Sequence, residues 1–375
     1  MSRSGPLVVL CVNSGSSSLK TALFEVDGTT EHELGRAAQP VEAGDYTAAL
    51  DAALAAFDER GLPQPGAAGH RVVHGGPHHA EPVLVDDGVL GELREVGPFA
   101  PLHIPAAISG IEAIGDRWDI PQVACFDTAF HKDMPALAQR LPLPDVLTEA
   151  GLRRYGFHGL SYEYVVGAMG AAALGRAVIA HLGNGASMVA VREGRSVDTT
   201  MGFTPTGGLV MSTRTGDLDP GVPVYLLREH GYDAERLERL VDRESGLVAL
   251  SGGTSDMQEL VERRVQDPRA AFAVDAFCYH ARQHVGALAA TLGGLDTLVF
   301  TGGIGEKAAS IRAGICRGLE HLGVAIDDMA NDAHADVISA PDSACVVRVV
   351  RTDEDVVIAR HTGALVGHQG PGPGR

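Results

Sequence analysis

The sequence predicts an α/β protein built from two domains of similar design. Apolar, strand-like runs alternate with helical patterns along the 375 residues, which is typical of layered α/β folds. A strand–turn–strand pattern occurs in the first half and again in the second. The hydrophobic fraction of 45% is sufficient for two cores of useful size.

The expected elements follow from apolar runs and from helix-boundary residues. Gly61 ends the first amphipathic helix, Asp267 and Pro268 begin the longest helix, and Gly293 ends it. In chain order we expect a strand at 7–11, a helix at 46–60, buried strands at 122–126, 177–181 and 297–300, a helix at 267–293, a helix at 307–322 and a strand at 345–350.

A polar loop follows the first strand. Residues 12–20 contain one Asn, four Ser and one Gly, and small hydroxyl and amide groups in a tight turn can bind an anion. The spacing of a Walker A loop is absent. An ordinary polar hairpin turn explains this stretch equally well.

The same pattern returns at residues 179–185, where a strand enters a Gly/Asn turn and is followed by an alternating strand at 187–192. In the first half, residues 10–16 are followed by a strand at 19–26. The pair suggests a duplicated domain with one glycine-rich hairpin per half. Two unrelated hairpins are the alternative interpretation.

Composition excludes several classes of protein. Lys and Arg number 30 against 48 Asp and Glu, a net charge of −18, which argues against general binding to nucleic acid or anionic membranes. The five Cys are scattered and form no CxxC motif, as expected for reduced core thiols. The N-terminus lacks a signal-peptide pattern and no apolar run approaches membrane-spanning length, so we expect a cytoplasmic protein.

A second glycine-rich turn lies at residues 301–306, where a strand leads into glycines and then a helix. Backbone N–H groups at such a helix start can bind an anion, and the missing side chains let a nucleotide approach. Alone, this motif is weak evidence for a nucleotide site, and the two glycine-rich hairpins strengthen it.

Two arginines have small and apolar neighbours, unlike solvated surface charges. They are Arg71, within residues 69–76, and Arg214, within residues 211–217. Two guanidinium groups on one phosphoryl group would stabilise its charge during transfer. The alternative is a buried structural Arg–Asp pair, with Asp217 or Asp219 as partner for Arg214.

Carboxylates at strand ends could hold Mg²⁺, which phosphoryl transfer requires. Asp127 follows a buried strand, and Glu354 and Asp355 lie where another strand gives way to a helix. Capping of that helix is the simpler interpretation of Glu354 and Asp355.

Two histidines, His103 and His158, each lie in a tight loop between apolar neighbours. Four others, at positions 70, 74, 78 and 79, suggest a zinc cluster, but their spacing matches no standard ligand set and an ordinary loop is favoured.

Together these motifs resemble those of acetate kinases. The resemblance is carried by residues 12–20, 70–76, 126–131, 156–159, 181–185, 201–205, 213–217 and 301–306, and it runs in order from about residue 7 to 362. It implies two ribonuclease-H-like domains of the actin-like ATPase superfamily with a central nucleotide cleft. It also implies domains at 1–131, completed by 356–375, and at 132–355.

The resemblance implies a role for each matching position. The catalytic residues would be Arg71, Asp127, His158 and Arg214, and the metal ligands Asn13 and Glu354. Acetate would contact Arg71, Val73, Leu102, His103, Phe157 and Pro205. ATP or ADP would contact Ser16, Ser18, Lys20, His181, Leu182, Gly183, Asn184, Gly185, Asp256, Met257, Gln258, Gly303, Ile304, Gly305, Glu306 and Lys307.

The implied reaction is Mg²⁺-dependent transfer of phosphate between ATP and acetate, with Mn²⁺ as a possible substitute and a homodimer as the expected assembly. Gln258, Lys307 and Asp353 depart from the family pattern, where Arg, Asn and Asn are usual. A propionate or butyrate kinase, a pyrophosphate-linked enzyme and a nucleotide-switched chaperone- or actin-like protein stay open as alternatives.

Overall fold

The computed structural model describes residues 5–15, 18–42, 45–101 and 103–368. The chain divides into two compact units. The first contains Met1–Lys132, His158–Tyr164 and Asp353–Arg375, and the second contains Asp133–Phe157 and Val165–Thr352. The expected domains differ from these units at residues 132, 158–164 and 353–355, which cluster with the first unit.

The first unit contains a six-stranded sheet in the order β3-β2-β1-β4-β6-β5. Strands β1 and β2 are antiparallel, as are β2 and β3, whereas β4 and β6 run parallel to β1. The strands are β1 Leu7–Ser14, β2 Ser18–Asp27, β3 Thr30–Pro40, β4 Ala67–Val72, β5 Val83–Leu84 and β6 Gln122–Phe126.

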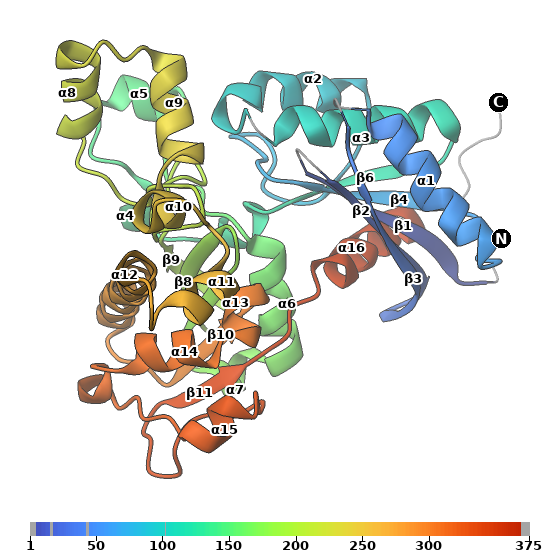
Figure 1. Ribbon diagram of the computed structural model, residues 1–375. Coiled ribbons are helices and arrows are strands. Elements are labelled where there is room, and N and C mark those ends of the chain that lie inside the picture. The colour runs from blue at the N-terminus through green and yellow to red at the C-terminus, as the bar shows by residue number, and fades with distance from the viewer. Residues whose placement is uncertain (1–4, 16–17, 43–44, 102, 369–375) are drawn as a thin grey trace. The chain divides into compact units, whose positions relative to one another are not determined.

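Helices cover both faces of this sheet (Figure 1). Alternate residues of β1 point to opposite faces, so Leu10 and Val12 pack against α1 and α3, whereas Val9 and Cys11 pack against α16. The helices of this unit are α1 Tyr46–Glu59, α2 Asp87–Val96, α3 Ile104–Arg117 and α16 Glu354–His368, with 3-10 turns at Gly97–Phe99 and Ala129–His131. Helix α6, Gly159–Met169, begins in the first unit and ends in the second.

The second unit repeats this topology. Its sheet has the order β11-β10-β7-β8-β9, with β7 antiparallel to β8 and parallel to β10. The register shifts once along the pairing of β2 with β3 in the first sheet, and once along the pairing of β8 with β9 in the second. The strands are β7 Arg176–Leu182, β8 Ala186–Arg192, β9 Arg195–Thr199, β10 Thr297–Thr301 and β11 Val346–Val349. The shared strand order agrees with the duplication that the two similar hairpins indicate.

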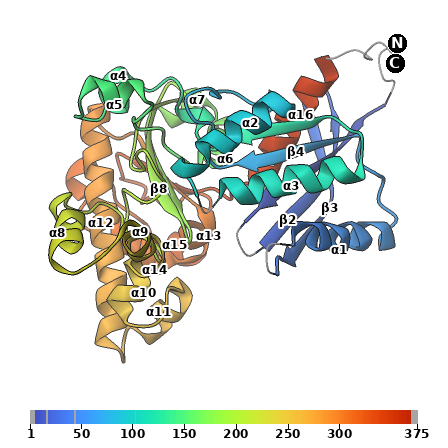
Figure 2. The ribbon, with the colours of Figure 1, turned by 90° about the horizontal axis from the view of Figure 1, so that it is seen from above.

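Helix α12, Pro268–Leu292, is the longest described element, and it lies along β8 (Figure 2). The Asp267 side chain caps its N-terminus, and Gly293, at a positive φ of 71°, ends it. The remaining helices are α4 Ala136–Gln139, α5 Asp145–Glu149, α7 Ala171–Leu174, α8 Gly221–Glu229, α9 Ala234–Arg243, α10 Gly246–Ser251, α11 Met257–Arg263, α13 Gly302–Lys307, α14 Ala309–Cys316 and α15 Asp328–Asp332, with a 3-10 turn at Glu320–Leu322.

One predicted helix is wrong in its boundaries. The expected helix at 307–322 begins earlier, at Gly302, and is interrupted at Ala308, whose ψ of 86° is not helical. It ends at Cys316 rather than at 322. In the described ranges no helix is both long and apolar enough to cross a membrane. All five cysteines are buried free thiols.

Candidate functional site

Three site residues lie at the same edge of the first sheet. Asn13 is near the end of β1, Arg71 near the end of β4, and Asp127 directly after β6. Because these strands are parallel neighbours, their carboxyl ends meet at one edge, where ligands bind in open α/β sheets.

Arg71 is the centre of this cluster. Its Nη2 donates to Asp127 Oδ2 at 2.6 Å, its Nε lies 3.1 Å from each Asp127 oxygen, and its Nη1 donates to Asn13 Oδ1 at 3.3 Å. Glu354, the first residue of α16, places Oε2 3.6 Å from Arg71 Nε. The guanidinium of Arg71 therefore lies close to two carboxylates and one amide oxygen.

The charges in the cluster support one another. Burial alone would lower the pKa of Arg71, but the nearby carboxylates Asp127 and Glu354 outweigh burial and raise this pKa. Asp127 is 1% exposed, and the contact with Arg71 stabilises its buried charge. The structural Arg–Asp pair considered for these arginines therefore exists at Arg71, with Asp127.

A second arginine, which sequence reasoning missed, neutralises the start of α16. Arg36 on β3 donates to Asp355 Oδ2 at 2.7 Å and to Asp353 Oδ2, the carboxylates on either side of Glu354. Burial raises the pKa of Asp355 to about 6. Asp353 Oδ1 accepts from Val356 N at 3.3 Å, so Asp353 caps this helix, not Glu354.

His158 has a constrained backbone next to the cluster. Its φ of 58° is rare for a residue with a side chain, and it is buried. Gly159 N donates to Asp127 O at 2.8 Å, and a Cβ at Gly159 would lie 2.2 Å from that oxygen. The close approach ties the His158 turn to the strand end that carries Asp127.

The last residue of β1, at the start of the polar turn, has an unsatisfied hydroxyl. Ser14 Oγ is buried and has no hydrogen-bond partner among the described residues. Gly15 N donates to Ser18 O at 2.8 Å, which tightens the turn, while Lys20 is exposed on β2. Ser16 lies outside the described residues. Sequence reasoning selected Ser16 and Ser18 and missed Ser14.

In the second unit, two glycine-rich turns lie at the ends of neighbouring strands. Thr301 of β10 pairs in register with His181 of β7, so the turns that follow these strands are adjacent. Gly302 has a φ of 76°, and a Cβ there would lie 2.8 Å from Leu182 O. Only glycine allows this approach. His181, Gly183 and Gly185 are partly buried, Leu182 is buried and Asn184 is exposed.

Arg214 lies in a segment bonded to the first of these turns. Ser212 N donates to Asn184 O at 3.2 Å, and Arg214 Nη1 donates to Pro205 O at 3.1 Å. Asp217 and Asp219, the partners considered for Arg214, instead accept from backbone N–H groups of the loop. Phe157 and Pro205 are both buried in this unit.

A buried arginine holds the turn at 302–307. Arg312, with no exposed surface, donates from Nη1 to Gly305 O and Glu306 O, both at 2.9 Å, and from Nη2 to Asn331 O at 2.7 Å. Glu306 Oε1 accepts from Gly302 N at 3.1 Å and Thr352 N at 3.2 Å, so this side chain supports the turn. Gly303 and Lys307 are exposed, and Ile304 is partly buried.

The remaining predicted positions differ in accessibility. Asp256 caps α11 by accepting from Glu259 N, Gln258 is exposed and donates to Glu262, and Met257 is buried in the core. In the first unit Val73 and His103 are partly buried, and Leu102 lies outside the described residues.

Two of the four histidines of the zinc alternative have side-chain partners of their own. His70 Nε2 lies 2.7 Å from Gln122 Oε1, and His79 Nε2 lies 2.7 Å from Glu92 Oε2. No group of three or more His, Cys, Asp or Glu suited to a metal occurs within the described ranges.

The donor set around Arg71 fits Mg²⁺ nonetheless. Asn13, Asp127 and Glu354 offer one amide and two carboxylate groups, all with oxygen donors. Mg²⁺ binds one or two protein carboxylates and completes its shell with water and phosphate oxygens.

Comparisons with known proteins identify the family of this chain. Residues 33–360 match the sequence model of the Acetokinase family. The chain is 45% identical to the acetate kinase of Rhodopseudomonas palustris CGA009, over 96% of this chain and 98% of that one, and 45% identical to the acetate kinase of Pseudarthrobacter chlorophenolicus A6, over 96% and 99%.

Two solved structures have the same fold. A propionate kinase from Francisella tularensis has a TM-score of 0.89 at 34% identity, covering 96% of this chain and 99% of that one. An acetate kinase from Porphyromonas gingivalis has a TM-score of 0.85 at 34% identity, covering 96% and 100%. The two-sheet architecture is that of the actin-like ATPases. The chain belongs to the acetokinase family, whose members are phosphotransferases with a carboxyl group as acceptor.

Proposed function

We propose that this protein transfers the γ-phosphoryl group of ATP reversibly and directly to acetate, forming acetyl phosphate and ADP. The observation that carries the proposal is the Arg71 cluster, in which Asn13, Asp127 and Glu354 surround one guanidinium at the carboxyl edge of the first sheet. The identity with acetate kinases along nearly the whole chain supports acetate as the acceptor.

The chemistry needs charge stabilisation more than proton transfer. Acetate, with a pKa of about 4 to 5, is already ionised at neutral pH, so no general base is required. A carboxylate oxygen attacks the γ-phosphorus, and the bond from that phosphorus to the β–γ bridging oxygen breaks as ADP leaves. The protein must offset repulsion between the carboxylate and the phosphate chain.

Each candidate residue has a role in this proposal. Arg71 and Arg214 stabilise negative charge on the oxygens of the transferred group, and His158 donates a hydrogen bond to it. Asp127 holds Arg71 in place through their bidentate contact. Val73 and Pro205 contact the methyl group of acetate. His103, Phe157 and Leu102 complete the acetate site.

The nucleotide would be held by three short segments. These are 181–185, 256–258 and 303–307, and Arg312 holds the last of them by donating to the carbonyl oxygens of Gly305 and Glu306. Ser14, whose hydroxyl has no partner among the described residues, and Ser16, Ser18 and Lys20 would face the phosphates. Asn13 and Glu354 would hold Mg²⁺, directly or through water. When bound, Mg²⁺ or Mn²⁺ neutralises phosphate charge and fixes the phosphate geometry.

The direct test is acyl phosphate formation, with the product trapped as its hydroxamate. Purified protein with Mg·ATP is expected to turn over acetate faster than propionate or butyrate. Arg214→Ala should abolish this turnover and retain nucleotide binding. Absence of product with every acid, and with pyrophosphate in place of ATP, would refute the proposal.

Propionate is the second candidate acceptor, because the Francisella propionate kinase superposes with a TM-score of 0.89. One methylene in an apolar pocket changes transition-state binding by only about 1–3 kcal/mol. A higher kcat/KM for propionate than for acetate in the same assay would identify propionate as the preferred acceptor.

We further propose a cytoplasmic homodimer. On α8 no residue is buried, and Val224, Tyr225 and Leu227 are 45%, 56% and 45% exposed. Apolar side chains gathered on one exposed helix mark an association surface. Sedimentation should show a dimer for the wild type and a monomer for Tyr225→Glu.

A further inference from the structure

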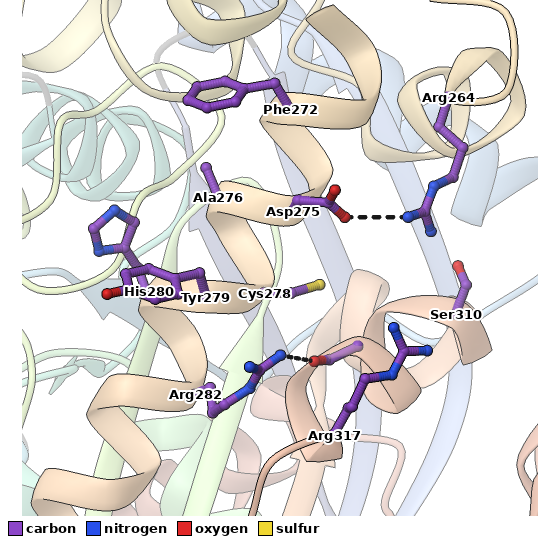
Figure 3. Close-up of a pocket in the computed structure, with 11 residues that line it drawn as sticks. Arg264, Phe272, Asp275, Ala276, Cys278, Tyr279, His280, Arg282, Ser310 and Arg317 are labelled. Atoms are coloured by element: carbon purple, nitrogen blue, oxygen red, sulfur yellow. Dashed lines mark hydrogen bonds and ion pairs between the residues drawn. The ribbon is translucent and has the colours of Figure 1, made fainter. Parts of the chain in front are cut away.

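A pocket lies within the second unit, apart from every segment assigned above. It has a volume of about 600 Å³ and is formed by one face of α12, by α14 and by Arg264 at the end of α11 (Figure 3). No residue of 181–185, 256–258 or 302–307 lines it. The reaction proposed above therefore leaves this pocket without a role.

Three arginines and one aspartate line the pocket, in a chain whose net charge is −18. Arg282 has a structural role, because its Nη2 donates to Gly314 O at 2.6 Å and its Nε to Ile315 O at 3.3 Å, which caps the last turn of α14. Arg264 pairs with the exposed Asp275 at 3.1 Å.

Arg317 and Ser310 differ from these two arginines. Their side chains have no hydrogen-bond or ion-pair partner among the described residues. In Figure 3 the guanidinium groups of Arg264 and Arg317 and the hydroxyl of Ser310 lie along the same side of the pocket. Two guanidinium groups and a hydroxyl on one side match the oxygens of a phosphate group.

The thiol of Cys278 supports this convergence independently. Its pKa is raised to about 11, mainly by burial and also by Asp275, whereas Arg264, Arg282 and Arg317 each act to lower it. All three positive charges are thus close enough to one buried thiol to act on it. Phe272 and Tyr279, 61% and 53% exposed, add aromatic surface to the lining.

We infer that this pocket is a second anion site, which binds a small phosphate monoester carrying a flat apolar group. The phosphate contacts Arg264, Arg317 and Ser310, and the apolar group packs on the rings of Phe272 and Tyr279. The two positive charges near the phosphate offset the desolvation of an anion in an otherwise acidic protein.

Calorimetry with phenyl phosphate and with inorganic phosphate tests the inference, in the presence of saturating Mg·ADP so that the catalytic site is occupied. We expect both probes to bind the wild type, and Arg317→Gln to weaken both by about tenfold. Tyr279→Ala should weaken phenyl phosphate more than inorganic phosphate. Arg195→Gln removes an exposed arginine on β9 and serves as the matched control, with unchanged binding.

A local readout and an activity control separate this inference from the proposed function. Phenyl phosphate should slow modification of Cys278 by a thiol reagent, located by peptide mass spectrometry, in the wild type and not in Arg317→Gln. Arg317→Gln should form acyl phosphate at the wild-type rate without added ester. Equal affinities in Arg317→Gln and Arg195→Gln, or no binding once Mg·ADP is saturating, would overturn the second site whatever the activity assay shows.

Discussion

His70 makes the stability of the first unit depend on pH. It lies in β4 with 1% of its surface exposed, between Val12 of β1 and Ala124 of β6. Its Nε2 is bonded to Gln122 Oε1, and its Nδ1 is buried without a partner in the described structure. Protonation would add a buried charge and an unsatisfied donor, so acidification should destabilise the fold.

The size of the effect follows from the pKa. Burial lowers the pKa of His70 from 6.5 to about 4, and the hydrogen bond to Gln122 offsets only part of this. The unfolded chain then binds more protons than the folded one, so this stability is present above pH 6.5 and is lost as the pH falls toward 4. Between about pH 7.5 and about pH 5 the loss is about 2 kcal/mol.

Trp118, the sole tryptophan, provides the assay because it lies in the first unit against the core that contains Leu10 and Val12. Urea unfolding followed by its fluorescence should show a loss of free energy of unfolding, from neutral to acidic pH, about 2 kcal/mol smaller in His70→Gln than in the wild type. The difference between the two proteins cancels the titration of the other histidines. Equal losses in both would refute this reasoning, and His70→Asn provides a second variant if His70→Gln does not fold.

Three further predictions concern the candidate site. Arg71→Met should lower kcat for acyl phosphate formation by about 10³-fold and stability by about 3 kcal/mol, because the buried Asp127 carboxylate loses its bidentate contact with the guanidinium. Adding Asp127→Asn should restore the urea midpoint and not the turnover. Arg36→Met should cost about 1 kcal/mol of unfolding free energy at neutral pH, through repulsion among the three carboxylates at the start of α16. The cost should be smaller near pH 4 in the same urea assay, because burial raises the pKa of Asp355 to about 6 and this carboxyl is then uncharged. Gly159→Ala should reduce kcat at least about tenfold, since its Cβ would lie 2.2 Å from Asp127 O, whereas Gly91→Ala, where the new Cβ meets nothing within 4 Å, should retain activity.

Local patterns in the sequence were sufficient for most strands and for the longest helix. The strand at 122–126 agrees with β6 residue for residue, and the helix opened by Asp267 and Pro268 begins and ends where its boundary residues indicate. Apolar runs and helix caps act over a few residues, so a sequence displays them directly.

Local sequence patterns did not predict the interruption between α13 and α14 at Ala308. The preceding carbonyls, of Gly305 and Glu306, accept from Arg312, and this competes with a continuous helix. The side chain that ends α13 comes from the next helix and depends on packing against Asn331.

For the site, the sequence by itself determined the types of residue at the strand ends: amide and hydroxyl groups after β1, an arginine in β4, a carboxylate after β6 and glycines after β7 and β10. Only the tertiary structure decided which groups pair. Arg71 meets Asp127 across 56 positions, and Arg36 meets Asp353 across 317. Parallel strand order and the return of α16 to the first sheet create these contacts, and no local pattern encodes them, because the energy of a buried charge depends on what the fold places beside it.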